Sequence, residues 1–149
     1  NTRIGVNSGN VIVGNVGGSA VFDYRPLGDA INTASRLESL NKHLGTRVCV
    51  AGKTVAQCAD FIGRPAGRMQ LKGKRDAIMV YEALTAAERQ SAAVRAYLAA
   101  YKLLEAGDAA APEAFAAAAA EHPDDPLIRF HHQRLQQGET GILVVMQEK

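Results

Sequence analysis

Hydrophobic and polar residues in the first part of the chain follow the short periods that are typical of strands. Residues 3–7 alternate and residues 11–13 are all apolar, which predicts two strands joined as a hairpin through Ser8-Gly9-Asn10. A glycine-rich loop is then expected from Gly14 to Gly28. Pro26 argues against an earlier start of the following helix, because the residue before a proline avoids helical geometry.

A helical period follows and predicts one helix over Asp29–His43. An acid in the first turn suits the helix dipole, and Gly45 is a favourable residue just beyond the end. The predicted buried stripe recurs at steps of three and four residues and consists of Ala30, Ala34, Leu37, Leu40 and Leu44.

Shorter elements follow this helix. The pattern predicts a strand over 47–51, a short helix over 52–60, and a hairpin whose strands cover 68–72 and 78–83. The order of strands and helices predicts an α+β fold or an α/β sandwich with one sheet.

The composition changes near Thr85, after which the chain is alanine-rich and helical. One helix is expected to end at Gly107-Asp108, a second to begin near Pro112, and a third to have Asp125 as its N-cap. Residues 141–146 form a last apolar run and predict a strand. The helices resemble one tetratricopeptide-type pair without a second copy, so they predict an extension rather than a repeat array.

Composition and charge exclude several classes of protein. An apolar fraction of 47% allows a real core, and a net charge of +2 is too small to indicate nucleic-acid binding. No apolar run reaches 18 residues, so no membrane-spanning segment is expected. Cys49 and Cys58 do not form a disulfide framework, which favours a reducing compartment such as the cytoplasm. The chain starts without Met, and we expect it to be a piece of a longer protein.

Asn32 and Arg36 are the first candidate for chemistry. They lie at positions i and i+4 of the predicted helix, away from its apolar stripe, so both side chains can reach one ligand. An amide and a guanidinium together can hold a sugar oxygen and a phosphate. A solvated helix face is the alternative that spacing alone leaves open.

The motif around these residues resembles the signature of class III adenylate and guanylate cyclases. The resemblance rests on Tyr-x-x-x-Gly-Asp-Ala-Ile-Asn-x-Ala-x-Arg-Leu-Glu over 24–38, on the segments 3–9 and 13–17, and on Leu71-Lys72-Gly73-Lys74 with Val80-Tyr81-Glu82. It implies that residues 1–84 are the C-terminal half of a ferredoxin-like cyclase sandwich that is truncated at its N-terminus. Residues 85–149 would be the helical extension.

The family also implies roles for individual residues at the interface of a head-to-tail homodimer. Asn32 would orient the ribose, and Arg36 would neutralise charge on the phosphates. Lys72 would contact the polyphosphate, unless it is an ordinary turn lysine. Arg25 occupies a position that helps to choose the base.

The family binds two Mg²⁺ or Mn²⁺ ions through aspartates that lie upstream of Asn1. We therefore expect no metal ligand in this chain and no activity from the chain alone.

The resulting expectation is an enzyme that converts ATP to cyclic AMP and pyrophosphate in signal transduction. Arg25 cannot accept a hydrogen bond from the adenine amino group, so a guanylate cyclase is one alternative. A degenerate cyclase-homology module that only dimerises is another. The helical extension as a docking site for another protein is a third. The family also allows a sensory region or a membrane anchor in the parent protein.

Overall fold

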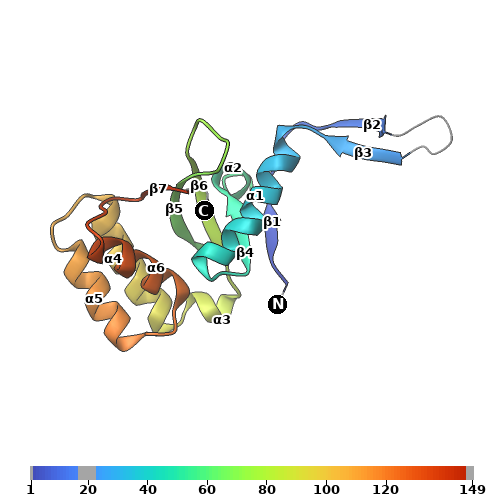
Figure 1. The fold of residues 1–149 in the computed structure, drawn as a ribbon. Coiled ribbons are helices and arrows are strands. Elements are labelled where there is room, and N and C mark those ends of the chain that lie inside the picture. Colours follow the sequence, from blue (N-terminus) through green and yellow to red (C-terminus); the bar gives the residue numbers. More distant parts are fainter. Residues whose placement is uncertain (1, 17–22, 147–149) are drawn as a thin grey trace.

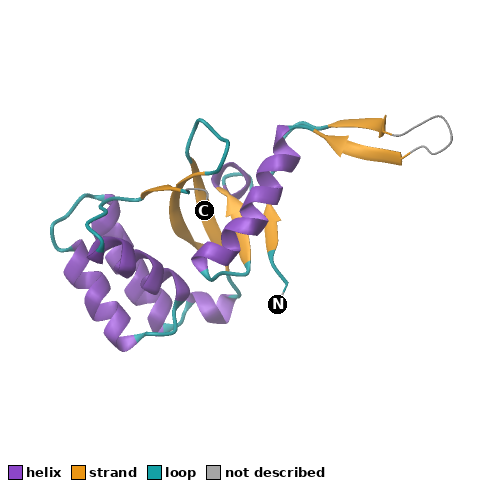
Figure 2. Cartoon of the chain, viewed as in Figure 1, coloured by secondary structure: helices purple, strands orange, loops and turns teal. Residues whose placement is uncertain are grey.

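The computed structural model describes residues 2–16 and 23–146, in which strands and helices are mixed along the chain (Figures 1 and 2). The strands are β1 (Ile4–Val6), β2 (Ile12–Val16), β3 (Asp23–Leu27), β4 (Val48–Ala51), β5 (Gly63–Gln70), β6 (Ile78–Ala83) and β7 (Leu143–Val145). The helices are α1 (Asp29–Leu44), α2 (Gly52–Val55), α3 (Ala86–Arg89), α4 (Ala92–Glu105), α5 (Ala111–Glu121) and α6 (Pro126–Gln136). The predicted α+β class is confirmed.

The larger sheet of the described residues has the strand order β1-β4-β6-β5-β7. β1 is parallel to β4, β6 is antiparallel to both β4 and β5, and β7 is parallel to β5. The predicted hairpin is confirmed as β5–β6, although its first strand covers Gly63–Gln70 rather than 68–72. The short helix predicted over 52–60 ends at Val55.

The hairpin predicted from residues 3–7 and 11–13 is wrong. β1 pairs with β4 in the larger sheet, whereas β2 pairs with β3 in a separate antiparallel ribbon that projects from the start of α1 (Figure 1). The loop predicted from Gly14 to Gly28 is therefore wrong in part, because Asp23–Leu27 is a strand. Pro26 is compatible with this ribbon because each strand of a two-stranded ribbon keeps an open edge. Residues 17–22 lie outside the described part.

α1 begins at Asp29 as predicted and extends one residue further, to Leu44. Leu37, Leu40 and Leu44 of the predicted stripe are buried. Gly45 ends the helix in the left-handed conformation, with φ of 75°, and its N–H donates to the Asn41 carbonyl at 2.9 Å.

The position of α1 on the sheet is fixed by a buried amide and a close backbone contact. The Asn41 side chain donates to the Ile4 carbonyl at 3.0 Å and accepts from Thr46 Oγ1 at 2.8 Å. Gly5 of β1 lies so close to the helix that a Cβ there would stand 2.2 Å from the Ala34 carbonyl oxygen. This strand and α1 therefore pack backbone against backbone.

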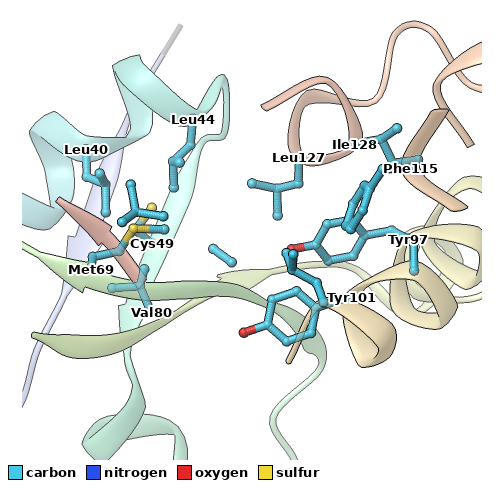
Figure 3. Packing of buried hydrophobic residues seen from close by; sticks show 14 of the residues in the cluster. Leu40, Leu44, Cys49, Met69, Val80, Tyr97, Tyr101, Phe115, Leu127 and Ile128 are labelled. Atoms are coloured by element: carbon cyan, nitrogen blue, oxygen red, sulfur yellow. The ribbon is translucent and has the colours of Figure 1, made fainter. Parts of the chain in front are cut away.

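The segment after Thr85 is helical and shares its core with the sheet. Asp125 is the N-cap of α6 as predicted, and it accepts from the backbone N–H groups of Leu127 and Ile128. The predicted terminal strand is confirmed as β7 and pairs with β5. The interpretation of the helices as a tetratricopeptide-type pair stays a prediction. Figure 3 shows one buried cluster that runs from the sheet to the helices; its labelled members include Leu40, Met69, Val80, Tyr97, Phe115 and Ile128.

Buried polar contacts also hold the extension against β5. Arg64 is 2% exposed, and its Nε donates to Glu82 Oε2 at 2.6 Å while its Nη1 donates to Asp125 Oδ2 at 2.9 Å. The Tyr97 hydroxyl donates to the Pro65 carbonyl at 2.6 Å. Among the described residues, no helix is both long and apolar enough to cross a membrane.

Candidate functional site

Asn32 and Arg36 lie one turn apart on α1, outside its buried stripe. The Asn32 side chain is exposed, and Arg36 is partly buried. The buried helix positions nearby are Thr33 and Leu37. The helix therefore presents the amide and the guanidinium away from the core, as the spacing predicts.

Arg36 and Lys72 line the same cavity, which has a volume of about 500 Å³. The other described lining residues are Gln70, Leu71, Gly73, Lys74, Val145 and Met146. Gly73 has φ of 73°, and a Cβ at this glycine would lie 3.1 Å from Arg36 Nη2. The β5–β6 turn thus passes directly beside the guanidinium. A cavity with Arg36, Lys72 and Lys74 on its lining can bind a polyphosphate.

The other two predicted site residues are Asn32 and Arg25. Asn32 lies on the same helix face but outside the lining of this cavity. Arg25 lies on β3, where its backbone is opposite Gly14, and its side chain lies outside the described part. The structure therefore brings together Arg36 and Lys72 of the four predicted residues.

An ion pair between Asp29 and Lys74 connects the start of α1 to the β5–β6 turn. The hydrogen bond from Lys74 holds the pKa of the Asp29 carboxyl below its usual range. The sequence predicted Asp29 as an acid of the first helical turn, which is confirmed, but gave no partner for it. Lys74 belongs to the Leu71–Lys74 motif, and its place in that motif is the sequence feature that could have marked it as a residue of the site.

Lys74 also lines a second cavity, of about 760 Å³, whose lining is largely apolar. Its described lining residues are Asn7, Asp29, Thr33, Ala51, Gly52, Lys53, Leu71, Lys74, Arg75, Asp76, Ile78, Met79 and Tyr81. Lys53 and Arg75 add positive charge to this lining. Sequence reasoning missed Lys53, which stands alone in the short helix α2 without a motif around it.

The carboxylates near these cavities do not fit a binding site for Mg²⁺ or Mn²⁺. Such ions require several oxygen ligands around one point. Within residues 2–16 and 23–146, no group of three or more His, Cys, Asp or Glu side chains is arranged to hold a metal ion. Asp29 is engaged by Lys74 instead.

Comparison with known proteins gives the family context of this geometry. Residues 1–84 match the family model described as "Adenylate and Guanylate cyclase catalytic domain".

Three curated relatives are similar to the same part of the chain. Adenylate cyclase 1 of Rhizobium meliloti (strain 1021) is 44% identical over 82 residues, which is 54% of this chain and 12% of that protein. Adenylate cyclase of Anabaena cylindrica is 35% identical, covering 53% of this chain and 16% of that protein. Soluble guanylate cyclase 89Da of Drosophila melanogaster is 39% identical, covering 50% and 11%. The chain therefore spans less than a fifth of the length of these relatives.

Two solved structures are similar to about half of the chain. A bacterial light-regulated adenylyl cyclase is 36% identical with a TM-score of 0.44, covering 50% of this chain and 21% of that chain. The adenylyl cyclase CyaB from P. aeruginosa is 26% identical with a TM-score of 0.45, covering 51% and 38%.

Proposed function

Because this chain belongs to the adenylate and guanylate cyclase catalytic domain family, we propose that the protein carrying it converts ATP to cyclic AMP and pyrophosphate. The observation that carries the proposal is the shared cavity of Arg36 and Lys72. A module that only dimerises has no need for three cationic side chains, Arg36, Lys72 and Lys74, on one cavity lining. Two of the relatives above are named adenylate cyclases and one a guanylate cyclase, so ATP is the substrate we propose and GTP is the alternative.

Each of the four candidate site residues has its own role in the proposed reaction. The 3′-hydroxyl loses its proton to solvent as its oxygen forms a bond to the α-phosphorus. The bond to the departing pyrophosphate breaks, and negative charge builds on the phosphoryl oxygens. Arg36 stabilises this charge more in the transition state than in the bound substrate, so it acts on kcat. Lys72 holds the polyphosphate in both states, Asn32 orients the ribose, and Arg25 contacts the base.

Mg²⁺ or Mn²⁺ belongs to the proposal as a metal whose ligands lie outside the described residues. From the family resemblance we propose that the metal-binding aspartates lie upstream of Asn1. For the same reason we propose that the isolated chain produces no cyclic nucleotide.

The partner that we propose is a second copy of the chain. Ile12 and Val13 of the projecting β2–β3 ribbon are 73% and 66% exposed. Ile4, Val6 and Val11 add further exposed apolar side chains near the start of the chain. Exposed apolar side chains such as Ile12 and Val13 on a projecting ribbon favour burial against another protein surface. We also propose a reducing compartment, the cytoplasm, for which the free thiols of Cys49 and Cys58 are supporting observations.

Replacement of Arg36 in the full-length protein tests the proposed function. Arg36→Ala should lower kcat by about 10²–10³-fold, which is typical for the loss of one preorganised donor to a developing charge. Arg36→Lys should not restore kcat, because lysine lacks the planar fork. Asn32→Ala should lower kcat as well. Arg95→Ala, at an exposed position on α4, is the matched control and should leave turnover unchanged.

Mixing of variants tests whether the site is shared between two copies. An Arg36→Ala chain combined with a chain that lacks its metal-binding aspartates should regain one working site per heterodimer. Normal turnover by Arg36→Ala, or no recovery in heterodimers of proven composition, would contradict the proposal.

A further inference from the structure

The strand contributed by the helical extension ends beside the segment that carries Lys72. β7 pairs with the last residues of β5, with Arg68 opposite Leu143 and Gln70 opposite Val145. Beyond this ladder the Met146 N–H donates to the Gln70 carbonyl at 3.0 Å. Gln70 is the last residue of β5, two positions before Lys72, so this hydrogen bond fixes the base of the turn.

The same strand forms part of the cavity wall. Val145 and Met146 line the cavity together with Arg36 and Lys72. Figure 1 shows β7 reaching the edge of β5 from the helical side of the molecule. The extension is therefore in direct contact with the candidate phosphate site, although the family match stops at residue 84.

Contacts from α6 hold β7 in this place. Arg134 donates from Nη1 to the Gly141 carbonyl and from Nη2 to the Leu143 carbonyl, each at 3.1 Å. Arg134 Nη1 also lies 2.9 Å from His131 Nδ1, and His131 Nε2 lies 2.7 Å from the Ala66 carbonyl of β5. Because arginine only donates, the imidazole accepts at Nδ1 and donates from Nε2. One chain of hydrogen bonds thus links α6 to both β5 and β7.

We propose that β7 is a positioning element for the candidate active site, which acts by holding the Lys72 turn against Arg36. This inference rests on the proposed cyclase function. Protection of an otherwise open β5 edge is the simpler role for such a strand. The two roles predict different results. A strand that only covers the edge of β5 would not affect substrate binding through Lys72.

The test removes one hydrogen bond from the strand in the full-length protein. Met146→Pro deletes the N–H that donates to Gln70. Leu143→Pro is the matched control, because alternate residues of a parallel edge strand direct their N–H groups away from the neighbour. Leu143→Pro also keeps the carbonyl that Arg134 contacts.

Met146→Pro should raise the KM for ATP about tenfold or more, because a misplaced turn loses the hydrogen bond from Lys72 to the charged polyphosphate, and the loss of such a bond has this order of effect. The same substitution should change kcat by less than about threefold. Leu143→Pro should stay within about twofold of the unmodified protein. In a Lys72→Ala background Met146→Pro should have almost no further effect, because residues that act through one contact are not additive. Deuterium uptake by the peptide over 70–76 should be faster in Met146→Pro than in Leu143→Pro.

Four results would overturn the inference: an unchanged KM, equal KM values for the two proline variants, full additivity with Lys72→Ala, or equal deuterium uptake. If the unmodified protein turns over neither ATP nor GTP, the proposed function fails instead. The deuterium uptake then decides alone whether β7 restrains the turn.

Discussion

Acidification from pH 7.5 to pH 5 should destabilise this chain by about 2 kcal/mol through His131. The ring is 0% exposed, and it accepts from Arg134 at Nδ1 while donating to the Ala66 carbonyl. Burial is the main cause that lowers the pKa of His131 to about 4; the nearby charges of Arg134 and Arg64 act in the same direction, and the bond to Ala66 opposes them. Protonation would place a second N–H against the Arg134 guanidinium.

The sign and size of the effect follow from the two pKa values. An unfolded histidine has a pKa of about 6.5. Between about pH 6.5 and pH 4, His131 is therefore protonated in the unfolded chain but neutral in the folded chain. The contribution of His131 is fully present above pH 6.5 and is lost as the pH falls. At pH 5 the difference corresponds to about 1.5 pKa units, or about 2 kcal/mol.

Urea unfolding at the two pH values, followed by circular dichroism, measures this difference. His131→Gln should lose about 2 kcal/mol less than the unmodified chain between pH 7.5 and pH 5. His132→Gln, at the half-buried neighbouring position, should keep the original pH dependence. An identical pH dependence for His131→Gln and the unmodified chain would refute the reasoning.

Three further substitutions test other parts of the molecule. Arg64→Ala leaves Glu82 buried without its partner and should lower the free energy of unfolding in urea by about 3–5 kcal/mol. Burial raises the pKa of Glu82, so this deficit should grow from pH 5 to pH 8, and a deficit that shrinks would be contrary to the argument. Gly5→Ala brings a Cβ against backbone atoms of α1 and should cost about 3 kcal/mol in thermal unfolding. Gly138→Ala meets no atom within 4 Å and should cost only about 1 kcal/mol for its positive φ, so equal losses would argue against the close packing. Arg25→Asp should change the ATP/GTP ratio of kcat/KM in the full-length protein, and an unaltered ratio would exclude Arg25 from base choice.

The central helix and the β5–β6 hairpin were predictable because local patterns determine them. The apolar stripe through Leu37, Leu40 and Leu44 has a helical period, and Gly45 supplies the left-handed residue that ends α1. The β5–β6 hairpin was predictable because the two alternating segments on either side of Gly73 pair with each other, and each is the other's nearest partner in the sequence.

The partners of β1 and β2 could not be predicted in the same way. Alternation identifies a strand but not its neighbour. The nearest partner was wrong here because each residue of β1 pairs with a residue of β4 that lies 44 positions later in the sequence. The features that fix β1 are its contact through Gly5 and the Asn41 amide. Both depend on three-dimensional packing that a single sequence does not display.

The candidate site was predicted in its residue types but not in its surroundings. Helical spacing placed Asn32 and Arg36 on one face, and the family motif pointed to Lys72. The contribution of Val145 and Met146 to the cavity depends on the pairing of β7 with β5, which links segments more than 70 residues apart. Nothing in the local sequence around Met146 indicates that pairing.

Arg36 and Lys72 are positioned by different parts of the fold, so substitutions in those parts should have different effects on activity. Arg36 depends on α1, which the Asn41 amide and the contact at Gly5 hold to β1. Lys72 depends on the end of β5, whose outer edge is occupied by β7. A disturbance of the extension therefore reaches Lys72 first and should weaken substrate binding, whereas a disturbance of α1 reaches Arg36 and should slow the chemical step. A variant at Gly5 that changed KM alone, or a variant at Met146 that changed kcat alone, would show that the two elements are coupled in a way that this packing does not explain.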